Sequence, residues 1–195
     1  MIRVCCSPKT VMSLSLDAKP CPEELPSMDR WCMCIKDDPY SDYQVLLVMN
    51  SESRFGFYIW DIMHVPTEEL PRLLLERMQM ALSYYGLRKE NMDPYFSEGL
   101  EICLGMDRSE TARIGSMANG LSYARPRKGR ERQAFLTQVR DINRRPVYPR
   151  TKDEFLTWDW MLGGLAQRYQ MMACCHPAYE LEASLLVKGT EVSTR

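Results

Sequence analysis

Residues 108–150 concentrate the side chains of this chain that could bind an anion. They include ten arginines and one lysine against three acidic residues, so the segment carries a net charge of +8, whereas the rest of the chain carries −9. Arginine presents a planar fork of N–H donors that fits phosphate and carboxylate oxygens, whereas lysine acts as a hydrated point charge. The asymmetry therefore predicts an anionic partner, either nucleic acid or an acidic protein surface.

The first part of this basic segment combines two arginines with glycines. Arg108 and Arg113 precede a glycine-framed stretch, residues 115–120. The usual interpretation of such a stretch is a turn or a site of close helix packing, and the alternative is a backbone cradle for an anion. The glycine spacing matches a phosphate loop, but Leu121 and Ser122 stand where that loop needs lysine followed by serine or threonine. A nucleotide-hydrolysing loop is therefore not predicted.

The remaining parts have the pattern of a docking surface. Residues 125–132 indicate an exposed basic loop, and residues 132–144 predict a helix with arginines on one face. Pairing of the arginines with acidic groups of the same molecule is the alternative, and the sequence leaves it open. The residues predicted to bind the anion or partner are Arg108, Arg113, Ser116, Asn119, Arg125, Arg127, Lys128, Arg130, Arg132, Arg140, Arg144 and Arg145.

Cysteine and histidine residues do not form a recognisable metal site. Cys32 and Cys34 are separated by one residue, whereas the usual zinc hairpin has two to four between its thiols. Cys174, Cys175 and His176 would have to supply the other half. We predict no metal and no cofactor, and we expect the eight cysteines to be reduced.

Catalytic residues are sparse as well. The two histidines, His64 and His176, stand in no nucleophile pattern, and no acid–base pair with a nucleophile emerges. We therefore favour a protein without enzymatic activity. The alternative is a small enzyme that acts on a phosphate-containing substrate with Arg108, Ser109 and Ser116.

Length and composition predict one folded unit. A chain of 195 residues with 45% hydrophobic and 26% charged residues suits a single domain, which we place at residues 1–165, with a partly irregular C-terminal extension at 166–195. No run of about 18 apolar residues is present, so no membrane span is expected. The N-terminus lacks the apolar stretch and cleavage site of a signal peptide, which predicts a cytoplasmic protein.

The hydrophobic pattern predicts alternating strands and helices. Strands are expected at residues 2–6, 31–36, 43–49, 54–61 and 100–104, the third and fourth forming an antiparallel hairpin. Helices are expected at 8–16, 67–85, from 111 onward and at 132–144, and after 151 with an interruption at Gly163 and Gly164. This order favours an α+β fold, a small and mainly antiparallel sheet covered by helices.

Several short motifs are shared with a known family. They are a tryptophan-led strand, an asparagine followed by an Arg-Phe strand, an Arg-Ser pair, a Gly-Ser-Met-x-Asn element and an Asn-x-x-Pro sequence. In this chain they stand at Trp31, Asn50, Arg54-Phe55, Arg108-Ser109, Gly115-Ser116-Met117, Asn119 and Asn143 with Pro146. Residues 2–150 thereby resemble an uncharacterised family of small bacterial and phage proteins, a domain of unknown function. The resemblance supports the fold and implies no particular chemistry.

These observations favour a binding or regulatory protein of a bacterium, phage or mobile element. Its arginine-rich face would dock on nucleic acid, a nucleoprotein complex or an acidic protein. By analogy, an inhibitor of a host defence complex fits this description.

Overall fold

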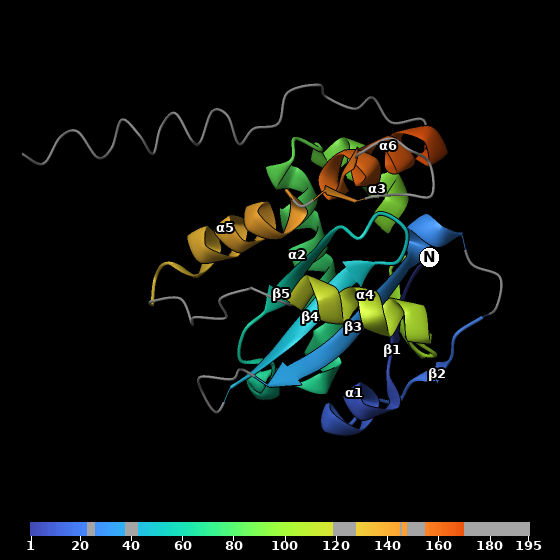
Figure 1. The fold of residues 1–195 in the computed structure, drawn as a ribbon, viewed down its shortest axis with the longest axis vertical. Helices are drawn as coiled ribbons and strands as arrows, with labels where there is room; N and C mark the ends of the chain where they lie inside the picture. Colours follow the sequence, from blue (N-terminus) through green and yellow to red (C-terminus); the bar gives the residue numbers. More distant parts are fainter. Residues whose placement is uncertain (23–25, 38–42, 119–127, 145, 148–154, 170–195) are drawn as a thin grey trace, which may run out of the picture.

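A six-stranded sheet forms the centre of the molecule (Figure 1). The computed structural model describes residues 1–22, 26–37, 43–118, 128–144, 146–147 and 155–169. The strand order across the sheet is β2-β6-β1-β3-β4-β5. The strands are β1 (Ile2–Cys6), β2 (Lys19–Pro20), β3 (Arg30–Asp37), β4 (Gln44–Asn50), β5 (Gly56–Ile59) and β6 (Leu100–Leu104); β7 (Pro146–Val147) and β8 (Phe155–Leu156) form a separate ladder.

The sheet is mixed. β1 is parallel to both β3 and β6, and β2 is parallel to β6, whereas β3, β4 and β5 are antiparallel neighbours. The α+β class and the predicted hairpin are confirmed. The mainly antiparallel arrangement holds only for the β3–β4–β5 half, because the chain leaves β1, β2 and β5 through long connections that bring the next strand back in the same direction.

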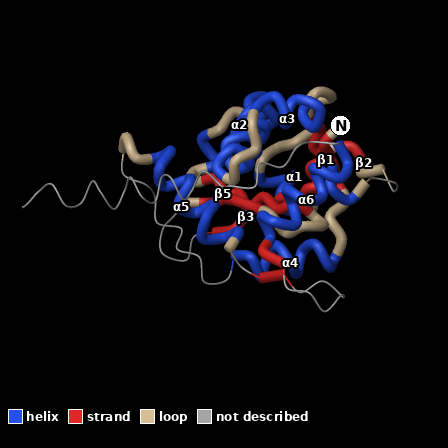
Figure 2. The backbone as a smooth tube through the Cα atoms, turned by 90° about the horizontal axis from the view of Figure 1, so that it is seen from above, coloured by secondary structure: helices blue, strands red, loops and turns tan. Residues whose placement is uncertain are grey.

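Helices cover both faces of the sheet, as Figure 2 shows, with α2 and α3 on one side and α4 on the other. Along β3 the side chains alternate, so Trp31 packs with the α2 side while Cys32 packs with the α4 side. The helices are α1 (Pro8–Ser13), α2 (Leu70–Tyr84), α3 (Lys89–Phe96), α4 (Arg108–Ala118), α5 (Glu131–Asn143) and α6 (Thr157–Tyr169).

Aromatic residues dominate the larger core on the α2 side. Trp31 is fully buried, and its Nε1–H donates to the Tyr95 hydroxyl over 2.7 Å. The Tyr95 hydroxyl in turn donates to the Met28 carbonyl over 2.8 Å, so the polar atoms of both rings are satisfied inside the core. Tyr85 stacks on Trp158 with ring centroids 5.4 Å apart, which joins α6 to this core. The predicted tryptophan-led strand is thus a central packing element.

The predicted interruption at Gly163 and Gly164 is wrong, because α6 continues through both residues. A side chain at Gly164 would begin 2.8 Å from the Met28 sulfur, so glycine here permits close packing of the helix on Met28. Close approach, rather than a break, explains this glycine. In the part of the chain that the structure describes, no helix has the length and apolar character of a membrane span.

Side-chain amides of α5 hydrogen-bond to the outer backbone edge of β5. Asn143 accepts from the Gly56 N–H over 2.8 Å and donates to the Gly56 carbonyl over 2.7 Å. Gln138 repeats this pattern two residues along the strand, accepting from the Tyr58 N–H over 3.2 Å and donating to its carbonyl over 2.8 Å. Both amide side chains are buried, so these bonds have no competing water.

Replacing Asn143 with alanine is expected to lower the free energy of unfolding by about 3 kcal/mol, because it leaves two buried backbone groups of Gly56 unpaired. Urea denaturation would measure the change. The exposed Gln133 on the same helix provides the control, since Gln133→Ala should change the free energy of unfolding by no more than about 0.5 kcal/mol. Equal effects of the two substitutions would contradict the role of the amide bonds.

Candidate functional site

Helix α4 presents two different faces, one to the sheet and one to solvent. Glu110, Ile114 and Met117 recur at helical spacing and are buried, whereas Arg108, Arg113 and Ser116 are exposed. Gly115 and Ser116 lie inside the helix, where backbone N–H groups bond to the preceding turn. A backbone cradle for an anion therefore does not form at residues 115–118, and the basic residues of this helix expose only their side chains. Asn119 and Gly120 lie outside the described residues.

The buried carboxylate of Glu110 fixes the start of α4. Its Oε2 accepts from the Asp107 N–H over 3.0 Å, and the Glu110 N–H donates to Asp107 Oδ1 over 2.7 Å. This reciprocal capping box satisfies two N–H groups that a helix start leaves without partners. It also explains why the helix begins at Arg108, three residues before the predicted position.

Glu110 also joins α4 to the sheet. Arg30 of β3 donates to it from Nε over 2.6 Å and from Nη2 over 3.0 Å, and the Ser51 hydroxyl donates over 2.7 Å. Burial raises the pKa of the Glu110 carboxyl, but these bonds and the Asp107 N–H outweigh that effect and hold the pKa below its usual range. The charge of Glu110 is therefore matched by Arg30 and not by the arginines of α4.

The turn between β4 and β5 is organised by Asn50, which is fully buried. Asn50 Oδ1 accepts from the Ser53 N–H over 2.9 Å and from the Ser53 hydroxyl over 3.0 Å, while Nδ2 donates to the Met28 carbonyl over 2.9 Å. The turn ends at Arg54, which has a left-handed backbone with φ of 59°. β5 consequently starts at Gly56, later than predicted.

Arg54 and Arg113 form a pair of like charges at this turn. Arg113 Nη1 donates to the Ser51 carbonyl over 3.1 Å, which holds its guanidinium beside the turn. Burial lowers the pKa of Arg54, and the positive charge of Arg113 lowers it further. Neither guanidinium contacts a carboxylate of the described residues. Two neighbouring positive charges without a contacting carboxylate favour the approach of an anion.

Arg54 lies outside the basic segment, and charge counting therefore missed it. The signal was present in the Asn50 to Arg54-Phe55 motif. Asn50 shapes the turn that carries Arg54, and Gly56 allows close approach of α4, because a side chain there would begin 2.7 Å from the Met117 sulfur. The packing of α4 on the hairpin thus brings Arg113 of the helix to the turn that carries Arg54.

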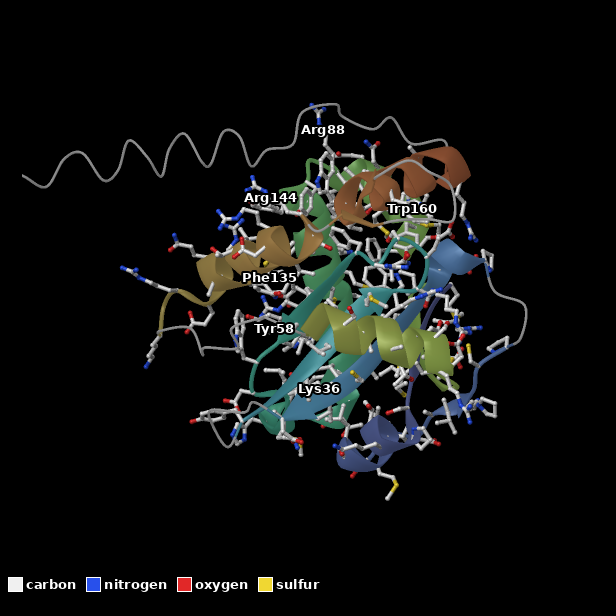
Figure 3. All side chains as sticks on the ribbon, viewed as in Figure 1. Lys36, Tyr58, Arg88, Phe135, Arg144 and Trp160 are labelled. Carbon is white, nitrogen blue, oxygen red and sulfur yellow. The ribbon has the colours of Figure 1, made fainter. Side chains whose placement is uncertain are left out.

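The other predicted binding residues form a second group on α5. Lys128, Arg130 and Arg132 are exposed at its start, and Arg144 is exposed just beyond its end. In Figure 3, Arg144 points outward, away from the sheet. Arg140 pairs with Asp141 over 2.9 Å, so the charge of this arginine is matched within the same molecule. Arg125, Arg127 and Arg145 lie outside the described residues.

The predicted basic surface therefore has two separate centres. Helix α4 crosses one face of the sheet, whereas α5 lies beyond β5, as Figure 1 shows. Arg108 stands at the start of α4 and Arg113 at the hairpin turn, so only Arg113 is brought together with Arg54. Ser116 is exposed, and its hydroxyl makes no hydrogen bond to the described residues.

The thiols of β3 serve as packing groups. Cys32 and Cys34 are buried against the α4 side of the sheet. Burial raises the pKa of both thiols, that of Cys34 to about 11. Within the described ranges, no cluster of three or more metal-binding side chains occurs. Cys174, Cys175 and His176 lie outside those ranges.

One comparison with known proteins gives a match. A family model with the description "domain of unknown function" (DUF6933) matches residues 4–158. No curated protein and no solved structure matches the chain. The matched range contains Arg54, Glu110, Arg113 and Asn143, so the hairpin turn, α4 and α5 lie within it.

The Glu110→Gln substitution is expected to lower the free energy of unfolding at neutral pH by about 2 kcal/mol, because it removes the charge that pairs with Arg30. The pKa of Glu110 is depressed in the folded protein, so its contribution is present above the unfolded pKa and lost as pH falls through the folded pKa. The difference between wild type and variant should therefore shrink in acid. Urea denaturation at several pH values would measure it, with Glu76→Gln as the exposed control. A difference that is independent of pH would contradict this assignment.

Proposed function

We propose that this chain, which belongs to the DUF6933 family, a domain of unknown function, is a non-enzymatic binding or regulatory protein. It docks on an anionic partner. We place it in the cytoplasm of a bacterium, or in a phage or mobile element that acts there. The observation that carries the proposal is the set of exposed arginines on α4 and α5 whose neighbouring acids are engaged elsewhere.

The three acids of the basic segment are engaged by groups other than Arg108, Arg113, Arg130 and Arg132. Glu110 is buried against Arg30, Glu131 accepts the Gly129 N–H over 3.0 Å, and Asp141 pairs with Arg140. Among the described residues, Arg108, Arg113, Arg130 and Arg132 have no ion-pair partner. This argues against self-pairing, which the sequence left open.

Nucleic acid is the partner that we test first. Guanidinium groups bind phosphate oxygens bidentately, and a phosphate backbone presents charges at regular intervals, so it can engage two separate centres at once. The Arg54–Arg113 pair would hold one phosphate and the start of α5 another. An acidic protein surface, such as that of a host defence complex, would use the same groups.

Binding to fluorescein-labelled single- and double-stranded oligonucleotides should weaken steeply as salt increases, because bound arginines release counterions. Substituting Arg54 and Arg113 with glutamine should reduce the slope of log affinity against log salt by about 2, and so should substituting Arg130 and Arg132. Fluorescence anisotropy at several salt concentrations would measure both quantities.

A control variant removes the same charge elsewhere. Lys19 and Lys36 are exposed on β2 and at the end of β3, so their substitution with glutamine should leave the slope unchanged. If the arginine variants bind as wild type does, the basic surface is not the docking site. If no oligonucleotide binds but an acidic polypeptide such as polyglutamate does, with the same arginine dependence, the partner is an acidic protein.

A further inference from the structure

A pair of thiols lies on the α4 side of the sheet, beside Arg30. The Cys5 thiol donates a hydrogen bond to the Cys21 sulfur, and the two Sγ atoms are 2.9 Å apart. Cys5 is in β1, whereas Cys21 directly follows β2. The two strands are not neighbours, because β6 lies between them.

The backbone at the end of β6 makes room for this contact. Cys21 N–H donates to the Leu104 carbonyl over 2.7 Å, which anchors Cys21 beside β6. Gly105, which follows Leu104, has φ of +135° and no side chain. A Cβ at Gly105 would lie 3.3 Å from the Cys21 Cβ. The Cys21 side chain therefore reaches past β6 toward β1.

The two thiols differ in access and in surroundings. Cys5 is fully buried, and burial followed by the bond to Cys21 raises its pKa. Cys21 is only partly buried, and Arg30 Nη1 donates to its sulfur over 3.2 Å. Partial exposure beside a guanidinium is the environment in which cysteines react with oxidants. An oxidant therefore meets Cys21 first and Cys5 second.

We propose that Cys5 and Cys21 form a redox modification site in which hydrogen peroxide, or another two-electron oxidant of this class, converts the thiol pair to a disulfide. Cys21 attacks one peroxide oxygen, which breaks the O–O bond, gives a sulfenic acid and releases water. The Cys5 sulfur then attacks the Cys21 sulfur, the S–O bond breaks, and the hydroxyl leaves as a second water with the Cys5 proton. Two thiols are oxidised, and one peroxide is reduced to two waters.

The geometry favours this pairing over the alternatives. A disulfide needs an S–S separation of about 2.05 Å, so the two sulfur atoms must close by about 0.9 Å. Cys32 and Cys103 are the in-register neighbours of Cys5 on the adjacent strands, but the Cys5 thiol donates to Cys21. Cys103 is the competing partner of Cys21, because burial and the neighbouring Cys21 thiol raise the pKa of Cys103. Cys6 belongs to the opposite core and donates to the Cys103 carbonyl. The bond would covalently join β1 to the end of β2.

Peptide mapping of the oxidised full-length chain tests the proposal. The reduced protein is treated with hydrogen peroxide, the remaining thiols are alkylated, and trypsin is added. Cys5 then lies in the peptide of residues 4–9 and Cys21 in the peptide of residues 10–30, because trypsin does not cut between Lys19 and Pro20. We expect these two peptides to be joined and two free thiols to be lost from this pair.

Four variants identify the sulfur atoms. Cys5→Ala and Cys21→Ser should each abolish the joined peptides, Cys21→Ser being the safer variant for folding because this side chain is partly exposed. Cys103→Ala should retain the joined peptides. Cys6→Ala should retain them too, which would show that Cys5, and not Cys6 of the same peptide, forms the bond. Circular dichroism would confirm that each variant is folded.

Three results would overturn the proposal. One is a join between residues 10–30 and the peptide of residues 90–108, which carries Cys103. Another is stable oxidation of Cys21 while Cys5 remains available for alkylation after unfolding. The third is an equally selective Cys5–Cys21 join in the urea-unfolded chain, because selectivity must come from the folded geometry.

Discussion

The buried carboxylate of Glu110 is the interaction on which the arrangement of this molecule depends. It is shared by three elements that are far apart in the sequence: the capped start of α4, Arg30 of β3 and Ser51 of the hairpin turn. A charge in this position is tolerated because every donor around it is fixed by its own element. The same contact turns the arginines of α4 outward, since the helix can meet Arg30 with only one face. One orientation of α4 therefore places Glu110 against the sheet and the arginines of the helix on the surface.

Much of the fold follows from local patterns in the sequence. The alternation along β3, the apolar stripe of α2 and the hairpin after Asn50 all depend on neighbouring residues, and the structure confirms them. Pairs that join distant residues could not be predicted in this way. Arg30 and Glu110 are 80 residues apart, and the parallel partners of β1 depend on how long connections cross the sheet. The glycines at 163 and 164 show the same limit, because their role is set by Met28 of another element.

The candidate site was only partly visible in the sequence. The sequence pattern separates Arg108 and Arg113 from the basic loop and helix that follow them, and the structure places the two groups on α4 and around α5. Charge counting missed Arg54, which joins Arg113 only because α4 packs on the hairpin turn. Proximity in space, and not density along the chain, brings the positive charges of Arg54 and Arg113 together. Asn50, Gly56 and Asn143 serve this geometry without carrying charge themselves.

The amide contacts between α5 and β5 also bear on how copies of this chain meet. An edge strand normally offers free N–H and C=O groups to any other strand, which allows sheets to join and aggregate. Here Gln138 and Asn143 already occupy the groups of Tyr58 and Gly56 that such a strand would need. At the opposite edge, β2 is two residues long and includes Pro20, which has no N–H to donate. The β5 edge is therefore closed to strand addition at Gly56 and Tyr58, and β2 offers only a short, proline-containing segment to another strand.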